Sequence, residues 1–249
     1  EVAKKYPQIE THHFTPSDNE LAEHYNRATF HADGPLLGSS FLSQYFVMRH
    51  AAKNGVKVLL DGQGSDEYLM GYLHSFSRLI GTEIKQLKPF PAVQLLLAHK
   101  KYHQLSLSQT AQVVAKSLFM SRYNEQDVYE HEYNKSRLLL NGSATKQLPI
   151  DLHKIPGSLS DNFLYHMLFT TSLPTLLHFE DRNSMAFSIE SRVPFLDHRL
   201  VEYAFCLPSF DKISKSGETK SILRKSMKDI LPHSIANRKD KKAFVTPGE

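Results

Sequence analysis

A short apolar strand followed by a glycine-rich loop is the feature that most limits how this chain can fold. Residues 56–60 read Val-Lys-Val-Leu-Leu, a run rich in β-branched residues with glycine on both sides, which predicts a buried parallel strand. Residues 61–67, Asp-Gly-Gln-Gly-Ser-Asp-Glu, then lead into a predicted helix. This order makes an α/β unit, and ligands of such units bind at the carboxyl ends of the strands.

Most of the remaining chain has the spacing of helices. Pro89 and Pro91 are expected to break this pattern, and Pro174 is expected to kink a long helix. A second short strand is predicted at residues 11–14, so the fold class is α/β and predominantly helical, with a small parallel sheet. The first predicted helix has Ser17 or Asp18 as its N-cap. The predicted helices cover residues 18–32, 40–53, 66–77, 92–102, 107–121, 126–139, 159–179, 197–205 and 219–231.

Composition excludes several classes of protein. The 249 residues suffice for one large or two small domains, and 41% hydrophobic with 22% charged residues is ordinary for a globular protein. No apolar run approaches the ~20 residues that cross a bilayer, and we expect neither a signal peptide nor a membrane partner. The single cysteine, Cys206, excludes an internal disulfide, is expected in the core, and favours a cytoplasmic setting.

The positive charge of the chain is unevenly distributed. The formal net charge is +4, and residues 212–242 contain ten Lys or Arg against three Asp or Glu. This stretch either attracts a polyanion such as the phosphates of ATP or forms a solvated helix face with a basic loop. Charge alone favours the solvated face, and no nucleic-acid partner is predicted.

The loop at residues 61–67 can bind a ligand or simply start a helix. Its glycines allow a tight turn and a close approach to the backbone. Ser65 and Asp66 stand at the helix start, where unpaired N–H groups can hold an anion. Asp66 can also supply a carboxylate oxygen to Mg²⁺. The alternative is that Ser65 and Asp66 only cap the helix, and the loop alone does not decide between these interpretations.

Three further segments carry charged residues suited to a binding site. Asp181 and Arg182 lie together at the end of an apolar helix. Glu190 and Arg192 alternate with apolar residues, so both point to one face if the segment is extended. A buried ion-pair network is the alternative for both of these segments, and it is a strong one for Glu190 and Arg192. Lys220 follows a glycine at a helix start, which suits a phosphate contact but also suits an ordinary surface helix.

Together these segments resemble the glutamine-hydrolysing asparagine synthetases. The resemblance rests on Gly-Gln-Gly-Ser-Asp-Glu at 62–67 with Gly-Tyr at 71–72, Asp-Arg-Asn-Ser-Met at 181–185, Glu-Ser-Arg-Val-Pro-Phe-Leu-Asp at 190–197 and Lys-Ser-Ile-Leu-Arg at 220–224. It implies a synthetase domain of the PP-loop ATP pyrophosphatase type, with an adenine nucleotide alpha hydrolase-like fold. Such ligases use ATP and Mg²⁺ to adenylate the side-chain carboxylate of aspartate, and ammonia then displaces AMP to give asparagine.

The resemblance also implies roles for individual residues. Asp66 matches the second Mg²⁺ ligand, and Lys220 matches a catalytic lysine that steadies charge on the phosphates. Gln63 stands at a catalytic position where well-studied members have glutamate; it can hydrogen-bond an intermediate but cannot accept a proton. The remaining implied residues line the acyl-adenylate pocket or lie just behind it: Gly62, Gly64, Ser65, Asp181, Arg182, Glu190 and Arg192.

Two parts of the family pattern are missing from the chain. No Ser-Gly-Gly occurs anywhere, so the pyrophosphate loop is expected upstream of residue 1, together with a glutaminase domain that supplies ammonia. Residues 1–249 are therefore expected to be a partial synthetase domain, truncated at both ends and inactive alone. A non-catalytic helical fragment and an amidotransferase for another acid, such as a sugar acid, are the alternatives. Exposed strand edges favour association, such as a homodimer.

Overall fold

The computed structural model describes residues 1–123, 127, 152 and 154–239, and most of these residues are helical. Apart from residue 127, the predicted helix at 126–139 lies outside the described residues. No helix in the described ranges is long and apolar enough to cross a membrane. The elements are α1 (Val2–Lys5), α2 (Asp18–His31), α3 (Ser39–Lys53), β1 (Val58–Leu60), α4 (Ser65–Tyr68), α5 (Ser75–Lys85), α6 (Pro89–His103), α7 (Leu107–Arg122), α9 (Leu159–His166), the π-helix η1 (Met167–Thr171), α10 (Leu173–Met185), β2 (Glu190–Arg192), the 3₁₀ helix η2 (Pro194–Leu196), α11 (His198–Cys206), α12 (Ser209–Lys212), α13 (Ser221–Ser226) and α14 (His233–Ala236).

The chain divides into two compact units. The first contains residues 1–64, 173–200 and 224–249, and the second contains residues 65–172 and 201–223. The chain first passes from one unit to the other between Gly64 and Ser65, in the middle of the glycine-rich loop. Each half of this loop therefore belongs to a different unit.

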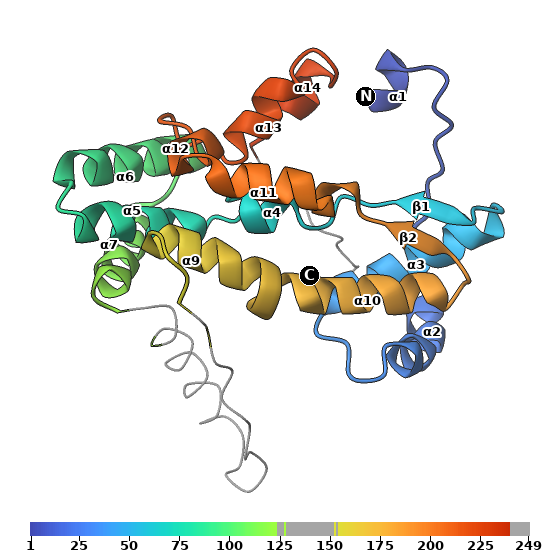
Figure 1. Cartoon of the computed structure of the whole chain (residues 1–249). Helices are drawn as coiled ribbons and strands as arrows, with labels where there is room; N and C mark the ends of the chain where they lie inside the picture. Colours follow the sequence, from blue (N-terminus) through green and yellow to red (C-terminus); the bar gives the residue numbers. More distant parts are fainter. Residues whose placement is uncertain (124–126, 128–151, 153, 240–249) are drawn as a thin grey trace, which may run out of the picture. The chain divides into compact units, whose positions relative to one another are not determined.

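The sheet of the first unit consists of β1 and β2, which lie side by side in Figure 1. The strands are parallel, and Leu59 is paired with Ser191. The predicted parallel strand at residues 56–60 is confirmed over its last three residues, but the prediction that it is buried is wrong, because Val58 is 45% exposed and Leu60 is 72% exposed. The predicted strand at 11–14 is wrong, because this segment has no regular structure and its Phe14 ring instead stacks on His50 at 5.2 Å. The true partner is a distant segment that local sequence patterns cannot identify.

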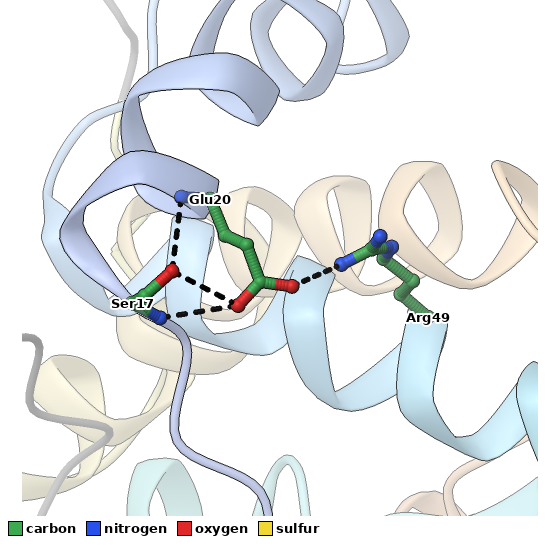
Figure 2. A network of polar contacts seen from close by, with 3 residues as sticks. All are labelled: Ser17, Glu20 and Arg49. Atoms are coloured by element: carbon green, nitrogen blue, oxygen red, sulfur yellow. Dashed lines mark hydrogen bonds and ion pairs between the residues drawn. The ribbon is translucent and has the colours of Figure 1, made fainter.

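Helices α2, α3 and α10 pack against one another in the first unit. Phe41 of α3 stacks on Phe179 of α10, with ring centroids 4.0 Å apart. The N-terminus of α2 is closed by a capping box in which Ser17 and Glu20 bind each other's backbone N–H groups, and Glu20 also pairs with Arg49 of α3 at 3.2 Å (Figure 2). The predicted N-cap at Ser17 is confirmed, and the same carboxylate fastens α2 to α3.

The second unit is helical and is built around α5. This helix packs against α6, α7 and α9. Gly81 of α5 allows a close approach to α7, because a Cβ there would lie 3.0 Å from the Ser117 carbonyl oxygen. The buried core is formed by Met70, Phe76, Leu79, Ile80, Ala92, Leu95, Phe163, Leu164, Met167 and Ile213. Cys206, expected in the core, is instead exposed at the end of α11.

Several predicted helices have different limits in the structure. The helix predicted at 66–77 is wrong, since α4 ends at Tyr68, Met70 has a φ of 55°, and α5 begins only at Ser75. The break expected at Pro89 and Pro91 is confirmed, since α5 ends at Lys85 and α6 begins at Pro89. The two prolines stand in the first turn of α6, where a missing N–H costs little. The helix predicted at 219–231 is shorter, because α13 ends at Ser226.

The long helix predicted at 159–179 is interrupted. Helix α9 gives way to the π-turn η1, and Ser172 separates η1 from α10. Pro174 therefore stands in the first turn of a new helix rather than at a kink within one. π-helical insertions of this kind often lie at functional sites. Here the break places the Ser172 hydroxyl 3.0 Å from Glu67 of the glycine-rich loop at residues 61–67, the signature loop.

Candidate active site

The second half of the signature loop forms a polar cluster in the second unit. The Lys220 ammonium lies 2.7 Å from Asp66 Oδ1 and donates a hydrogen bond of 3.2 Å to the Ser65 hydroxyl. The side chains of Lys220 and Asp66 are each 24% exposed, so the pair is partly desolvated yet open to a ligand. Three residues chosen from the sequence, Ser65, Asp66 and Lys220, are thus brought together.

Gly71 provides the space for this pair. A Cβ at Gly71 would overlap Asp66 Oδ1 and would lie 2.7 Å from Lys220 Cε. No side chain can occupy this position without moving both charged groups. The glycine of the Gly-Tyr dipeptide at 71–72 therefore has a steric role at this pair.

The backbone around Lys220 is held in an uncommon conformation. Lys220 has a φ of 51°, in the left-handed region that non-glycine residues seldom adopt. The preceding turn is fixed by the bridge between Ile213 and Thr219 and by a hydrogen bond of 2.9 Å from Ser214 N to Glu218 O. A backbone conformation of this kind is maintained only when its surroundings determine it, as this turn does.

Glu67 anchors the end of the signature loop. It is 1% exposed and accepts hydrogen bonds from the Tyr72 hydroxyl at 2.6 Å and the Ser172 hydroxyl at 3.0 Å. Burial, followed by the Glu67 contact, raises the pKa of Tyr72 above its usual range. Tyr72 therefore remains a hydrogen-bond donor, and Glu67 ties the loop to the segment that follows η1.

The first half of the loop lies in the first unit and follows β1 directly. Asp61 N donates to the Arg192 carbonyl at 2.8 Å, which extends the pairing of the two strands by one residue. Gly64 has a φ of 96°, and a Cβ there would overlap the Leu196 side chain. Glycine is thus required at position 64 because of its positive φ and because the Leu196 side chain leaves no room for a Cβ. Gly62 is open, because a Cβ added there would have nothing within 4 Å.

A buried carboxylate stands behind this half of the loop. Glu180 of α10 is 3% exposed and accepts a hydrogen bond of 2.6 Å from the Ser191 hydroxyl of β2. Gln44 Nε2 of α3 donates to its other oxygen. Asn183 in turn donates to Gln44 Oε1 at 2.9 Å, so the network joins α3, α10 and the sheet.

The environment of Glu180 favours its neutral form. Burial raises the pKa of Glu180 to about 7, and the carboxylate of Asp61 adds to this effect. Hydrogen bonds from Ser191 and from the Gln63 side chain act in the opposite direction and lower the pKa. A carboxyl group that titrates near neutral pH is a candidate for proton transfer.

The other four predicted binding residues lie at the surface. Asp181 and Arg182 are exposed, and Arg182 pairs with Asp33 at 2.9 Å. Glu190 and Arg192 share one face of the extended strand β2, as predicted, with Arg192 Nε 2.7 Å from Glu190. The alternative of a buried ion-pair network is wrong for this pair, because both side chains are 59% exposed. Their role in ligand binding stays a prediction.

Sequence reasoning misses two features of these clusters. Gly71 belongs to the matched pattern, but the reason for it appears only with Asp66 and Lys220 in place. Sequence alone favours Asp181, whereas the buried carboxylate is its neighbour Glu180. The signal for Glu180 is its helical spacing, since it is seven residues after buried Leu173 and three before buried Asn183.

Comparison with known proteins places the chain in a family. The family model described as asparagine synthase matches residues 1–248. The chain belongs to the asparagine synthase family. No solved structure matches it.

The relatives of this asparagine synthase-family chain carry two kinds of name. Asparagine synthetase [glutamine-hydrolyzing] 1 of Bacillus subtilis is 30% identical over an alignment of 243 residues, which covers 93% of this chain but 37% of the relative. Amidase chyE of Penicillium rubens is 27% identical over an alignment of 271 residues, which covers 94% of this chain and 39% of the relative. Asparagine synthetase [glutamine-hydrolyzing] 3 of Bacillus subtilis is 45% identical over 76 residues, 30% of this chain and 12% of the relative. The chain thus spans less than half of these relatives.

The family resemblance implies Mg²⁺, and the residues present suit a shared site rather than a closed protein cage. The described residues contain no cluster of three or more His, Cys, Asp or Glu side chains that could hold a metal ion. Mg²⁺ with a nucleotide needs only one or two carboxylates, since phosphate oxygens and water complete its shell. Asp66, partly exposed and set at a helix start, fits this requirement.

Proposed function

We propose that the full-length protein containing this chain is an ATP-dependent, AMP-forming ligase. It adenylates the side-chain carboxylate of aspartate with release of pyrophosphate, and ammonia derived from glutamine then displaces AMP to give asparagine. The observation that carries the proposal is the cluster of Lys220, Asp66 and Ser65 around Gly71. Family membership and the position of the loop after a parallel strand support a PP-loop type of fold.

The cluster has the charge and the access that phosphate binding needs. Lys220 supplies a positive charge fixed by a rigid turn, so it needs little reorganisation when negative charge grows on a phosphate. Asp66 would hold Mg²⁺, which neutralises phosphate charge when it is bound. The Lys220–Asp66 contact keeps both groups in place before the nucleotide arrives.

Adenylation can be tested directly in the full-length protein. Exchange of labelled pyrophosphate into ATP should require an acid acceptor, and aspartate should support it. Lys220→Ala should lower this exchange by about 10²-fold or more, the range found when a preorganised charge is removed. Lys215→Ala, an exposed lysine of the preceding turn, is the matched control and should leave exchange unchanged. Acceptor-independent ATP hydrolysis, or normal exchange by Lys220→Ala, would contradict the assignment.

The identity of the acid is a separate question. Relatives named as amidases in Penicillium rubens and Gibberella zeae match 94% of this chain, which favours testing acceptors other than aspartate. A panel of aspartate, other dicarboxylic acids and sugar acids should be compared by acid-dependent pyrophosphate release. Release with a sugar acid and not with aspartate would keep the reaction type and change the substrate.

The 249-residue chain alone is predicted to be inactive. It contains no Ser-Gly-Gly sequence, so a principal phosphate-binding element of the proposed fold would have to come from elsewhere in the parent. Calorimetric titration of this chain with Mg-ATP should show weak or no binding. Micromolar binding would contradict this prediction and would show that the Lys220 cluster suffices.

A further inference from the structure

A cavity of about 340 Å³ in the second unit is not used by the proposed reaction. It lies where the end of α5 packs against α9, and its lining extends from Thr82 and Lys85 on α5 to His166, the last residue of α9. This volume is in the range of binding sites for small molecules. The described residues that line it include neither Lys220 nor Asp66, so the cavity is separate from the candidate active site.

The segment that follows Lys154, on one side of the cavity, is held in place by side chains of α9. Asn162 is buried; its side chain accepts a hydrogen bond of 2.9 Å from Ile155 N and donates to the carbonyl oxygens of Ile155 at 3.1 Å and Ser158 at 3.0 Å. Ser158 also caps α9 in a reciprocal capping box with Asp161. These bonds fix the cavity wall before any ligand binds, as is usual for small-molecule sites.

The lysines that line the cavity bring positive charge without a matching negative charge. Lys85 and Lys154 are both exposed, and no hydrogen bond or ion pair joins either ammonium group to a described residue. None of the described lining residues is Asp or Glu. The carboxylate of the nearby Asp161 is bound by the Ser158 N–H at 2.9 Å and by the Ser158 hydroxyl at 2.7 Å. The cavity therefore suits a ligand that brings two negative charges of its own.

Two exposed lysines alone would not indicate a site, since charged side chains usually face solvent. Lys85 stands in the last turn of α5, where a cation also interacts favourably with the helix dipole. Here, however, the two cations line a cavity together with the apolar side chains of Leu152 and Leu159 and the buried hydroxyl group of Thr82. Sites for small molecules combine apolar walls with a few polar or charged groups in this way.

We infer that this cavity binds a small dianion, whose negative charges contact Lys85 and Lys154 while its body lies against Leu159. Dicarboxylic acids and phosphate monoesters share this chemistry, because each carries about two negative charges near neutral pH. The inference is independent of the proposed amide-forming function, since the described lining includes no residue of the Lys220 cluster.

Calorimetric titration of the full-length protein with four probes tests the site. Succinate and glycerol 3-phosphate are the dianions, and succinamide and glycerol are their uncharged counterparts. At low ionic strength at least one dianion should bind with a Kd of roughly 1 mM or lower, and its uncharged counterpart should not bind. Added salt should weaken the binding, because the two lysines are open to solvent.

Variants of the two lysines assign the binding to this cavity. Lys85→Gln and Lys154→Gln should each weaken it by about 10-fold or more, the usual contribution of a hydrogen bond to a charged group. Both side chains are exposed, so neither change should unfold the protein. Lys101→Gln, at an exposed lysine of α6 outside the cavity lining, is the matched control and should bind the dianion normally. Lys220→Ala should also bind it normally.

Each outcome supports or overturns the inference. Binding of one dianion or both, weakened by Lys85→Gln and Lys154→Gln but not by Lys101→Gln, establishes the site, and the dianion that binds identifies the ligand class. Failure of both dianions to bind overturns it, and so does equal binding of the uncharged compounds or of the dianion by both cavity variants. Loss of binding in Lys220→Ala would place the ligand at the candidate active site and would also overturn it. Pyrophosphate exchange tests the proposed function separately.

Discussion

The Lys220 ammonium and Asp66 Oδ1 lie 2.7 Å apart, although the two residues come from widely separated parts of the second unit. Both side chains are partly buried, and a partly buried charge is costly unless it is paired. The ion pair holds the two side chains toward each other. A nucleotide with a divalent cation would offer each of them a new partner, so the pair can open when the ligand binds.

Replacing Gly71 by alanine should disrupt the Lys220–Asp66 pair while leaving the identity of both charged residues unchanged. The added Cβ would overlap Asp66 Oδ1, so the carboxylate must move away. A displacement of roughly 1 Å at a reacting centre costs about 10²-fold in rate. Acid-dependent ATP–pyrophosphate exchange by the full-length protein would measure the loss.

The control for Gly71 is a glycine with free space around it. A Cβ added at Gly34 would have nothing within 4 Å, and Gly34 does not have a positive φ, so Gly34→Ala should retain full exchange. If Gly71→Ala also retained it, the Asp66–Lys220 geometry would not limit the reaction.

Gly217 should prove necessary for the turn that presents Lys220. Its φ is 90°, and a Cβ would lie 2.7 Å from the Ala98 carbonyl oxygen of α6. Gly217→Ala should therefore destabilise the protein by about 1–3 kcal/mol through backbone strain and should lower exchange as Lys220 is displaced. Urea unfolding and the exchange assay, run on the same preparation, would measure both effects.

Asparagine separates conformation from space at this position. Asn adopts a positive φ readily, so Gly217→Asn removes the backbone strain but keeps the clash of the Cβ with Ala98. If that clash is important, Gly217→Asn should be as impaired as Gly217→Ala. Gly55 has a φ of 78° with nothing within 4 Å, and Gly55→Asn should be tolerated. Full activity of Gly217→Asn would show that only the backbone angle is important there.

The sequence predicts the parts of the site that depend on local chemistry. The glycine-rich loop after β1 and the lysine before α13 are recognisable because turns, strand ends and helix starts have local signatures. The shared face of Glu190 and Arg192 follows from strand geometry alone. The Lys220–Asp66 contact itself is tertiary, and in the sequence only the family pattern links the two residues.

Long-range packing is what the sequence does not predict. Residues 11–14 have the composition of a strand, but β1 pairs with β2, which comes much later in the chain. Glu180 and Asp181 look equivalent in sequence, and only the packing of α10 on α3 decides which of them is buried. The break at Ser172 has a similar origin, because its partner Glu67 belongs to a distant loop.

Removing the cap of α2 should weaken the first unit. Ser17 accepts a hydrogen bond from Glu20 N, and Glu20 binds Ser17 N and Arg49 (Figure 2). Ser17→Ala should lower the free energy of unfolding by about 1 kcal/mol, the usual cost of losing an N-cap. Ser17→Asp keeps an acceptor and should restore stability. Urea denaturation followed by circular dichroism would measure the change, and equal stability of Ser17→Ala and Ser17→Asp would contradict it.

The raised pKa of Glu180 should also appear in stability, with a defined sign. Its pKa rises from an ordinary value of 4.5 to about 7 on folding, so between these values the folded protein binds more protons than the unfolded chain. The stabilisation from its neutral form is therefore complete below pH 4.5 and is lost as the pH rises to about 7.

Relative to Glu180→Gln, which cannot titrate, the unaltered protein should lose on the order of 3 kcal/mol of unfolding free energy across this window. Urea titrations at several pH values would measure the difference, with Glu23→Gln, at an exposed glutamate of α2, as control. A difference that stays constant with pH would show that folding does not raise the pKa of Glu180.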